Sequence, residues 1–240
     1  MGFGGAPSHP DYSDKMVHPY RCAHNVLLAH AAVVARYRNK YQPLQEGKIG
    51  ITNNCDWREP LTSSPSDIAA AERQVLFQLG WFADPVFLGD YPPPMRAILG
   101  NALPTFTDEE RALVFGSADF FGLNHYGTGF GFNIAWPGWQ SSYSGTSEEG
   151  FPRAQSAWLF ASGWGFRKLL NFVHARYGGP DIYVTEGGWS LEADDAEAGR
   201  RDPERTMYYA NYTSEMLKAI QEDGVAVKGY FAWSLMDNFE

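Results

Sequence analysis

Apolar residues recur along the chain in two patterns, one typical of helices and one of buried strands. Spacings of three or four residues predict helices at 20–41, 67–79, 164–177 and 203–222, with shorter ones near 95–99 and from Thr107. Compact apolar runs predict strands at 48–52, 119–126, 181–186 and 227–235. These runs are apolar enough to be buried on both faces, which is typical of parallel strands. Because strands alternate with helices, we expect parallel βα units and an α/β fold.

Polar and aromatic side chains follow the predicted strands and do not precede them. Strand 119–126 ends in Asn124 and Tyr126, and strand 181–186 ends in Glu186, directly before two glycines. Barrel enzymes carry their chemistry at this end of their strands. The pattern therefore favours a TIM (β/α)8 barrel with an active face built by βα loops, although four strands are half of the eight required. The stretch 127–156 is predicted to be a long loop.

Composition and charge narrow the functional classes. Hydrophobic residues make up 44% and aromatic residues 15% of the 240 residues, which excludes a disordered chain. The net charge of −9 argues against binding to nucleic acid, which needs a clustered basic face. No run has transmembrane length and no signal-peptide pattern opens the sequence. We expect no membrane partner, and localisation stays open with the cytoplasm as the default.

Cysteine and histidine spacing gives no support for a metal or a cofactor. Cys22 and Cys55 are too few for a disulfide framework and form no CxxC pair, so two buried thiols are expected. His24 and His30 lie six apart, which is not a metal-ligand spacing on a helix. The glycines of 127–131 lack the spacing of a dinucleotide loop. We predict no metal and no cofactor.

Five residues are candidates for a site, and each has a structural alternative. Glu186 at a strand end suits chemistry better than a purely structural ion pair. Asn124 and Tyr126 lie two apart, so their side chains point to the same side of the strand. The Tyr126 hydroxyl would fix the rotamer of a neighbouring glutamate by a hydrogen bond. That Tyr126 is simply a core residue is an equal alternative. A Trp in a barrel strand, such as Trp233, is more often a core residue than a sugar platform. A carboxylate near a chain end, such as Glu240, is usually solvated. Acidic and aromatic side chains together suggest a sugar site.

Five collinear segments spanning essentially the whole chain resemble motifs of glycoside hydrolase family 1, the β-glucosidase family. Residues 184–188 resemble its nucleophile motif (I/V)TENG, 229–240 its last-strand motif GYFxWSLxDNFEW, 119–126 its DFxGxNxY motif, 24–38 its HNxLxAHAxAVxxYR helix, and 80–95 its GWFxDPxxxGDYPxxM segment. The resemblance implies part of a TIM (β/α)8 barrel. The matching part of the barrel is about the last four βα units, and strands one to four are missing. We expect residues 1–240 to form a single domain, the C-terminal part of such a barrel.

The resemblance also implies roles for the five candidates. Glu186 resembles the catalytic nucleophile, Tyr126 the tyrosine that hydrogen-bonds it, and Asn124 a supporting residue. Trp233 resembles the platform under the glycone, the sugar that is cleaved off. Glu240 resembles the carboxylate that grips its outer hydroxyls, and phosphosugar-specific members replace this acid. An unphosphorylated glycone is therefore implied.

Two departures from the family pattern matter. Gly187 stands where the family usually has Asn, which we expect to loosen the loop. The family's acid/base glutamate belongs to an Asn-Glu-Pro motif at the fourth strand, which has no counterpart in the chain. Asp56 and Glu59 follow the first predicted strand, but neither matches that motif, so a substitute role for them is disfavoured.

The resulting prediction is a retaining β-glycosidase that hydrolyses O-glycosidic bonds of unphosphorylated β-glucosides or related oligosaccharides. The chain would carry the nucleophile without the acid/base and would be inactive or very weak alone. A noncatalytic carbohydrate-binding or scaffold remnant is the alternative, and a thioglucosidase-like member with Gln as acid/base is a third. Trp136, Trp139 and Tyr143 are candidates for shaping the aglycone subsite. Glycone preference and oligomeric state stay open.

Overall fold

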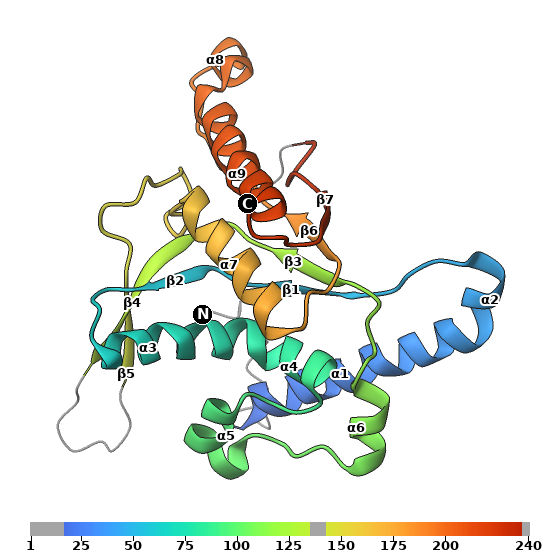
Figure 1. Ribbon diagram of the computed structural model, residues 1–240. Helices are drawn as coiled ribbons and strands as arrows, with labels where there is room; N and C mark the ends of the chain where they lie inside the picture. Colours follow the sequence, from blue (N-terminus) through green and yellow to red (C-terminus); the bar gives the residue numbers. More distant parts are fainter. Residues whose placement is uncertain (1–16, 135–142, 237–240) are drawn as a thin grey trace. The chain divides into compact units, whose positions relative to one another are not determined.

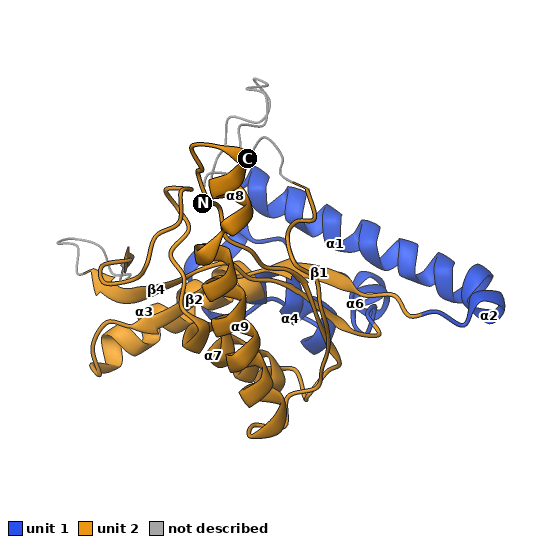
Figure 2. Ribbon diagram, turned by 90° about the horizontal axis from the view of Figure 1, so that it is seen from above, with its two compact units in different colours: residues 1–47, 80–118 blue, residues 48–79, 119–240 orange. Residues whose placement is uncertain are grey.

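The computed structural model describes residues 17–134 and 143–236. The chain divides into two compact units, residues 1–47 with 80–118 and residues 48–79 with 119–240 (Figure 2). Glu240, Trp136 and Trp139 lie outside the described residues. The expectation that residues 1–240 form a single domain stays a prediction.

The first unit is helical. Its elements are α1 His18–Arg36, a π-helical turn Tyr37–Tyr41, α2 Gln42–Gln45, α4 Trp81–Leu88, α5 Pro93–Leu99, a 3-10 turn Gly100–Ala102 and α6 Asp108–Val114. Helix α1 contacts α4 and α6 and buries Leu27, Ala31 and Val34, whose spacing of four and three puts them on one face. This apolar stripe confirms the helix predicted over 20–41.

The sequence analysis missed one helix of this unit, and its expectation of two buried thiols was wrong for Cys22 and is confirmed for Cys55. Helix α4 was missed because Gly80 and Pro85 are poor helix formers, yet Pro85 lies inside it. Cys22 is exposed and Cys55 in the second unit is buried, and both are free thiols. Burial raises the pKa of Cys55 well above its ordinary value. The start of α6 agrees with the prediction, because Thr107 and Glu110 form a reciprocal capping box.

The second unit contains a four-stranded parallel sheet (Figure 1). Its strands, in spatial order, are β1 Ile51–Asn54, β3 Phe121–Asn124, β6 Ile182–Glu186 and β7 Val227–Tyr230. Phe121 pairs with Ile51 on one side and Ile182 on the other. Phe121, Leu123, Ile182 and Val184 are fully buried. The four predicted strands are therefore confirmed, although the last one ends at Tyr230 instead of Leu235.

Helices connect the parallel strands. Helix α7 Gly163–Arg176 lies between β3 and β6, and α8 Ala196–Arg201 and α9 Pro203–Gln221 lie between β6 and β7. Helices α7 and α9 pack against each other. Helix α8 lies in an acidic segment for which no helix was predicted, and its N-terminus is capped by Asp195, which accepts from the backbone of Glu197 and Ala198.

A second sheet takes up part of the expected loop over 127–156. Strand β2 Trp57–Pro60 pairs in parallel with β4 Thr128–Ile134, which pairs antiparallel with β5 Tyr143–Ser147. Helix α3 Pro65–Val75, continued by a π turn Leu76–Gly80, contacts all three strands. A Cβ on Gly131 would lie 2.8 Å from the Ala71 Cα. The glycines that suggested a loop thus include one that lets helix and strand approach closely.

An ion-pair clamp joins α7 to the end of α9. Arg167 donates Nε–H to Asp223 Oδ2 and Nη2–H to Asp223 Oδ1, each at 2.7 Å. The same guanidinium reaches Glu222 Oε2 at 2.7 Å, and Asn171 donates to Asp223 Oδ2 at 2.6 Å. These hydrogen bonds, Arg167 foremost, lower the pKa of Asp223 to about 2.

The clamp predicts a loss of stability in acid. The folded pKa of Asp223 lies below the unfolded value of about 3.9, so its contribution is complete above about pH 4. It is lost as pH falls through about 2. Asp223→Asn should lower the melting temperature at pH 7 and flatten the decline between pH 4 and 2 in thermal scans. The control is Asp194→Asn at an exposed position, which should leave the dependence of the melting temperature on pH as in the parent. Equal dependences for the Asp223 and Asp194 variants would contradict the clamp.

Candidate functional site

The ends of β3 and β6 bring the two central candidates together. Tyr126 follows β3, Glu186 ends β6, and the Tyr126 Oη–H donates to Glu186 Oε2 at 2.8 Å. The His125 backbone N–H donates to the Glu186 carbonyl at 3.0 Å. Parallel pairing sets this proximity, because Asn124 is the register partner of Glu186. A carboxylate is thus oriented by a phenol at the carboxyl end of the sheet.

Asn124 lies at the same end and contacts the site through a neighbour. Its Oδ1 accepts a hydrogen bond from the Thr185 hydroxyl at 2.6 Å. Thr185 directly precedes Glu186, so this bond ties the two strand tips together across the sheet. Asn124 has no recorded hydrogen bond to the Glu186 carboxylate.

Trp233 lies against the loop that follows Glu186. Its backbone N–H donates to the Gly187 carbonyl at 2.9 Å, and its side chain is 40% exposed. The role predicted for this Trp as a sugar platform stays a prediction. The structure therefore brings Glu186, Tyr126, Asn124 and Trp233 to one end of the sheet.

The loop that carries the two glycines after Glu186 packs closely against its neighbours, and the loosening expected from Gly187 stays a prediction. The Gly187 carbonyl accepts from Trp233 and, at 3.4 Å, from the Tyr209 hydroxyl. A Cβ on Gly187 would lie 2.6 Å from the Tyr230 Oη, and one on Gly188 would collide with the Trp233 carbonyl oxygen. These contacts tie the loop to the end of β7.

Gly188 gives a test of this packing. Gly188→Ala should destabilise the chain by about 1–3 kcal/mol, because the colliding partner is backbone and must shift. Gly199→Ala in α8 is the matched control, since a Cβ there meets only Ala193 at 3.5 Å. The control should be neutral or slightly stabilising. Urea unfolding checks both, and equal midpoints would rule out the tight approach.

A buried aromatic layer supports Tyr126 from behind. Tyr212 donates its hydroxyl to the Tyr126 carbonyl at 3.0 Å and accepts from the Ser162 N–H at 3.2 Å. His125 stacks on Phe166, with centroids 5.1 Å apart and an interplanar angle of 9°. Burial lowers the pKa of His125, so this ring is neutral. Strand alternation points His125 away from Asn124 and Tyr126.

Trp158 was missed by sequence reasoning. Its ring meets Tyr126 edge-on, with centroids 5.7 Å apart and an angle of 80°, and it is 63% exposed. No periodic pattern marks the segment around it. An exposed indole beside the phenol that binds Glu186 provides an apolar surface for a ligand ring.

The two other acids after β1 have structural partners. Asp56 Oδ1 accepts from the Gly127 N–H at 3.0 Å and its Oδ2 lies 3.6 Å from Arg58. Glu59 accepts from the Trp57 indole at 2.8 Å and from Lys168 at 2.6 Å. These contacts argue against either acid as a substitute acid/base.

Within residues 17–134 and 143–236, no group of three or more His, Cys, Asp or Glu side chains is placed to hold a metal ion. None of the helices in these ranges combines the length and apolar character needed to cross a bilayer.

Comparison with known proteins identifies the family. Residues 1–240 match the model of glycosyl hydrolase family 1, so the chain belongs to this family. Its α/β fold is part of the family's TIM barrel.

Three relatives show how much of the barrel is present. Beta-glucosidase 1B of Phanerodontia chrysosporium is 42% identical over 95% of this chain and 43% of its own length. Beta-glucosidase 42 of Arabidopsis thaliana is 43% identical over 94% of this chain and 49% of its own. The crystal structure of a GH1 beta-glucosidase from the fungus Humicola insolens in complex with glucose superposes with a TM-score of 0.91 at 40% identity, covering 99% of this chain and 53% of that one. The chain spans about half the length of the relatives it matches.

Proposed function

We propose that this chain is the C-terminal half of a retaining β-glycosidase that hydrolyses unphosphorylated β-glucosides. The observation that carries the proposal is the hydrogen bond from Tyr126 to Glu186 at the carboxyl end of β6. Family membership supports the reaction class. The Humicola insolens relative was crystallised with glucose, which supports glucose as the glycone.

In the proposed mechanism Glu186 is the nucleophile. Its carboxylate attacks the anomeric carbon and forms a covalent glycosyl-enzyme, while Tyr126 holds the attacking group in place. A retaining enzyme needs a second carboxyl group about 5–5.5 Å away to protonate the leaving oxygen and then activate water. We propose that this acid/base is supplied by sequence upstream of the chain. Asp56 and Glu59 are engaged elsewhere.

Three further residues are proposed to bind substrate. Trp233 would stack under the glycone and Glu240 would accept hydrogen bonds from its outer hydroxyls. Trp158 would contact the aglycone, because its exposed ring flanks Tyr126. Asn124 would act as a positioning residue through Thr185.

The proposal is tested by covalent trapping of the 240-residue chain. A 2,4-dinitrophenyl 2-deoxy-2-fluoro-β-glucoside carries a leaving group that departs without protonation, so trapping requires only the nucleophile. Intact-mass measurements should show a time-dependent adduct that saturates with reagent concentration. Glu186→Gln should form none, although it keeps the size of the side chain.

Trapping also tests the aglycone role of Trp158. Trp158→Ala should raise the half-saturating concentration of the dinitrophenyl reagent by about 2- to 10-fold, since one aromatic contact is lost. Trp164→Ala is the control, because Trp164 is also partly exposed and packs instead near Phe151 and Lys168. An equal effect of both substitutions would remove Trp158 from the subsite.

A noncatalytic carbohydrate-binding remnant is the second candidate. The exposure of Trp233 favours it equally, because a sugar platform needs no nucleophile. This function predicts that sugars shift the ¹⁹F signal of Trp233 in a chain labelled with 5-fluorotryptophan, while no covalent adduct forms. The trapping experiment therefore separates the two candidates.

A further inference from the structure

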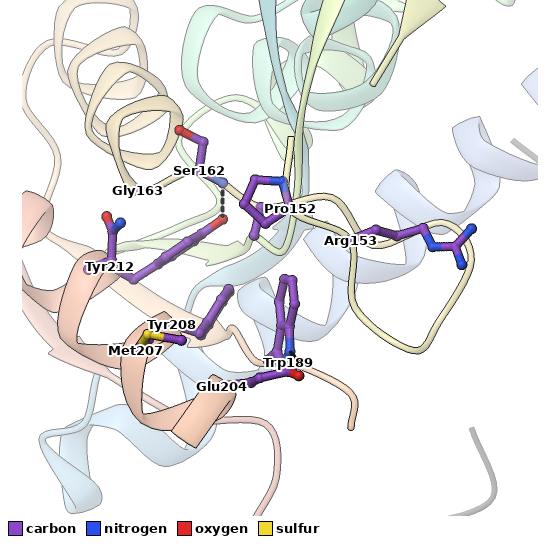
Figure 3. Close-up of a pocket in the computed structure, with 11 residues that line it drawn as sticks. Pro152, Arg153, Ser162, Gly163, Trp189, Glu204, Met207, Tyr208 and Tyr212 are labelled. Atoms are coloured by element: carbon purple, nitrogen blue, oxygen red, sulfur yellow. Dashed lines mark hydrogen bonds between the residues drawn. The ribbon is translucent and has the colours of Figure 1, made fainter. Parts of the chain in front are cut away.

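A cavity lies beside the segment that follows Glu186. It has a volume of about 560 Å³ and opens between α9, the start of α7 and the segment that follows β6. Trp189, three residues after Glu186, forms one wall, and Tyr208 and Tyr212 of α9 form another (Figure 3). Cavities of about 300–1,000 Å³ with aromatic walls are the usual size and lining of small-molecule sites.

The lining of this cavity has a defined chemistry. The Trp189 and Tyr208 rings pack with centroids 5.7 Å apart at 34°. Tyr208 is buried, so it holds the half-buried Trp189 indole in place as the aromatic face of the cavity. The Trp189 indole N–H donates to Glu204 Oε2 at 3.0 Å. This bond fixes the exposed carboxylate at the edge of the aromatic wall and leaves Oε1 available as an acceptor. Asn211 adds an amide to the lining.

A ligand of this cavity must suit both its aromatic face and the charged groups on its lining. Glu204 and Arg153 place one carboxylate and one guanidinium on the lining, so neither a cation nor an anion is favoured there and a neutral ligand fits best. An acceptor beside an aromatic face suits a ring with an apolar face and hydroxyl donors on its periphery. A pyranose ring has both, whereas an aromatic hydrocarbon lacks the donors.

We propose that this cavity is a second sugar-binding site, which takes a neutral pyranoside against Trp189 with its hydroxyls on Glu204 and Asn211. The site is separate from the proposed glycone site at Trp233 and does not depend on the proposed function. It adjoins that site, because Tyr212 of the cavity wall donates to the Tyr126 carbonyl.

The test is a titration of the full 240-residue chain labelled with 5-fluorotryptophan. The ¹⁹F signals of Trp189 and Trp233 are assigned with Trp189→Phe and Trp233→Phe. Methyl β-D-glucopyranoside should shift the Trp189 signal saturably, with a Kd on the order of 1 mM for a ligand of this size. Glu204→Gln should weaken that Kd by about 3- to 10-fold, since a charged acceptor is lost. Glu197→Gln on α8, outside the cavity, should leave it unchanged.

The two tryptophan signals keep this site apart from the proposed function. A sugar that shifts Trp233 but not Trp189 would overturn the second site and leave the glycosidase proposal standing. A shift of Trp189 by phenol but not by the glucoside would also overturn it. So would a glucoside Kd at Trp189 that Glu204→Gln does not change. A saturable Trp189 shift with failed trapping at Glu186 would support this site and count against the proposed nucleophile.

Discussion

Expressed alone, the 240-residue chain should hydrolyse p-nitrophenyl β-glucoside at least about 10²- to 10⁴-fold more slowly than an intact family 1 β-glucosidase, which is the range that general acid–base assistance contributes. Glu186 can attack, but in our account nothing in the chain protonates the leaving oxygen or activates water. The described acids after β1 are bound to Gly127 and Lys168 instead. Half a barrel also gives the sugar fewer contacts.

Two controls separate a missing acid/base from a failure to bind. The rate should fall much less for a 2,4-dinitrophenyl glucoside, because that leaving group needs no proton. Azide should accelerate turnover of the same substrate, since an anionic nucleophile needs no general base. Turnover of p-nitrophenyl β-glucoside equal to that of an intact relative would contradict the proposal that the acid/base lies upstream.

Phe166→Ala should destabilise the chain by about 3–5 kcal/mol. Phe166 is fully buried in α7. It stacks on His125 at 5.1 Å and on Tyr212 at 5.3 Å. Its removal leaves a cavity beside His125, directly before Tyr126. Loss of this ring should therefore weaken both the fold and the support of the candidate site.

Urea unfolding followed by circular dichroism measures this loss. The urea concentration at the midpoint of unfolding should fall. The slope of the unfolding free energy against urea concentration should stay unchanged, because the folded state keeps its compactness. Phe231→Ala is the matched control, since Phe231 is 58% exposed and its truncation should stay within about 0.5 kcal/mol. Equal midpoints for the two variants would show that the stack is not a structural support.

Local patterns were enough to predict the central sheet and to place Tyr126 and Glu186 at strand ends, but the pairing of these two residues was expected only from the family resemblance. The strand runs at 119–126 and 181–186 are short and apolar, and each ends in the residue of interest. Parallel pairing then brings Tyr126 and Glu186 to the same edge. The hydrogen bond between them was expected from family resemblance, and the geometry agrees at 2.8 Å.

The missed features depend on contacts between distant residues. Strand β4 pairs with β2, about seventy residues earlier, and its glycines include Gly131, which packs against Ala71 of α3. Composition alone makes this segment resemble a loop. Trp158 has no periodic neighbours, and only its packing on Tyr126 brings it to the site. The residues that donate hydrogen bonds to the Gly187 carbonyl, Tyr209 and Trp233, are likewise distant in sequence.

Peptide mass mapping of the trapped chain tests the central claim most directly. After reaction with the dinitrophenyl 2-fluoroglucoside, the chain is digested and the modified residue is identified by fragmentation. Our account predicts a single fluoroglucosyl ester on Glu186. An ester on Asp56, Glu59 or another acid, or an unmodified chain after prolonged incubation with saturating reagent, would contradict it.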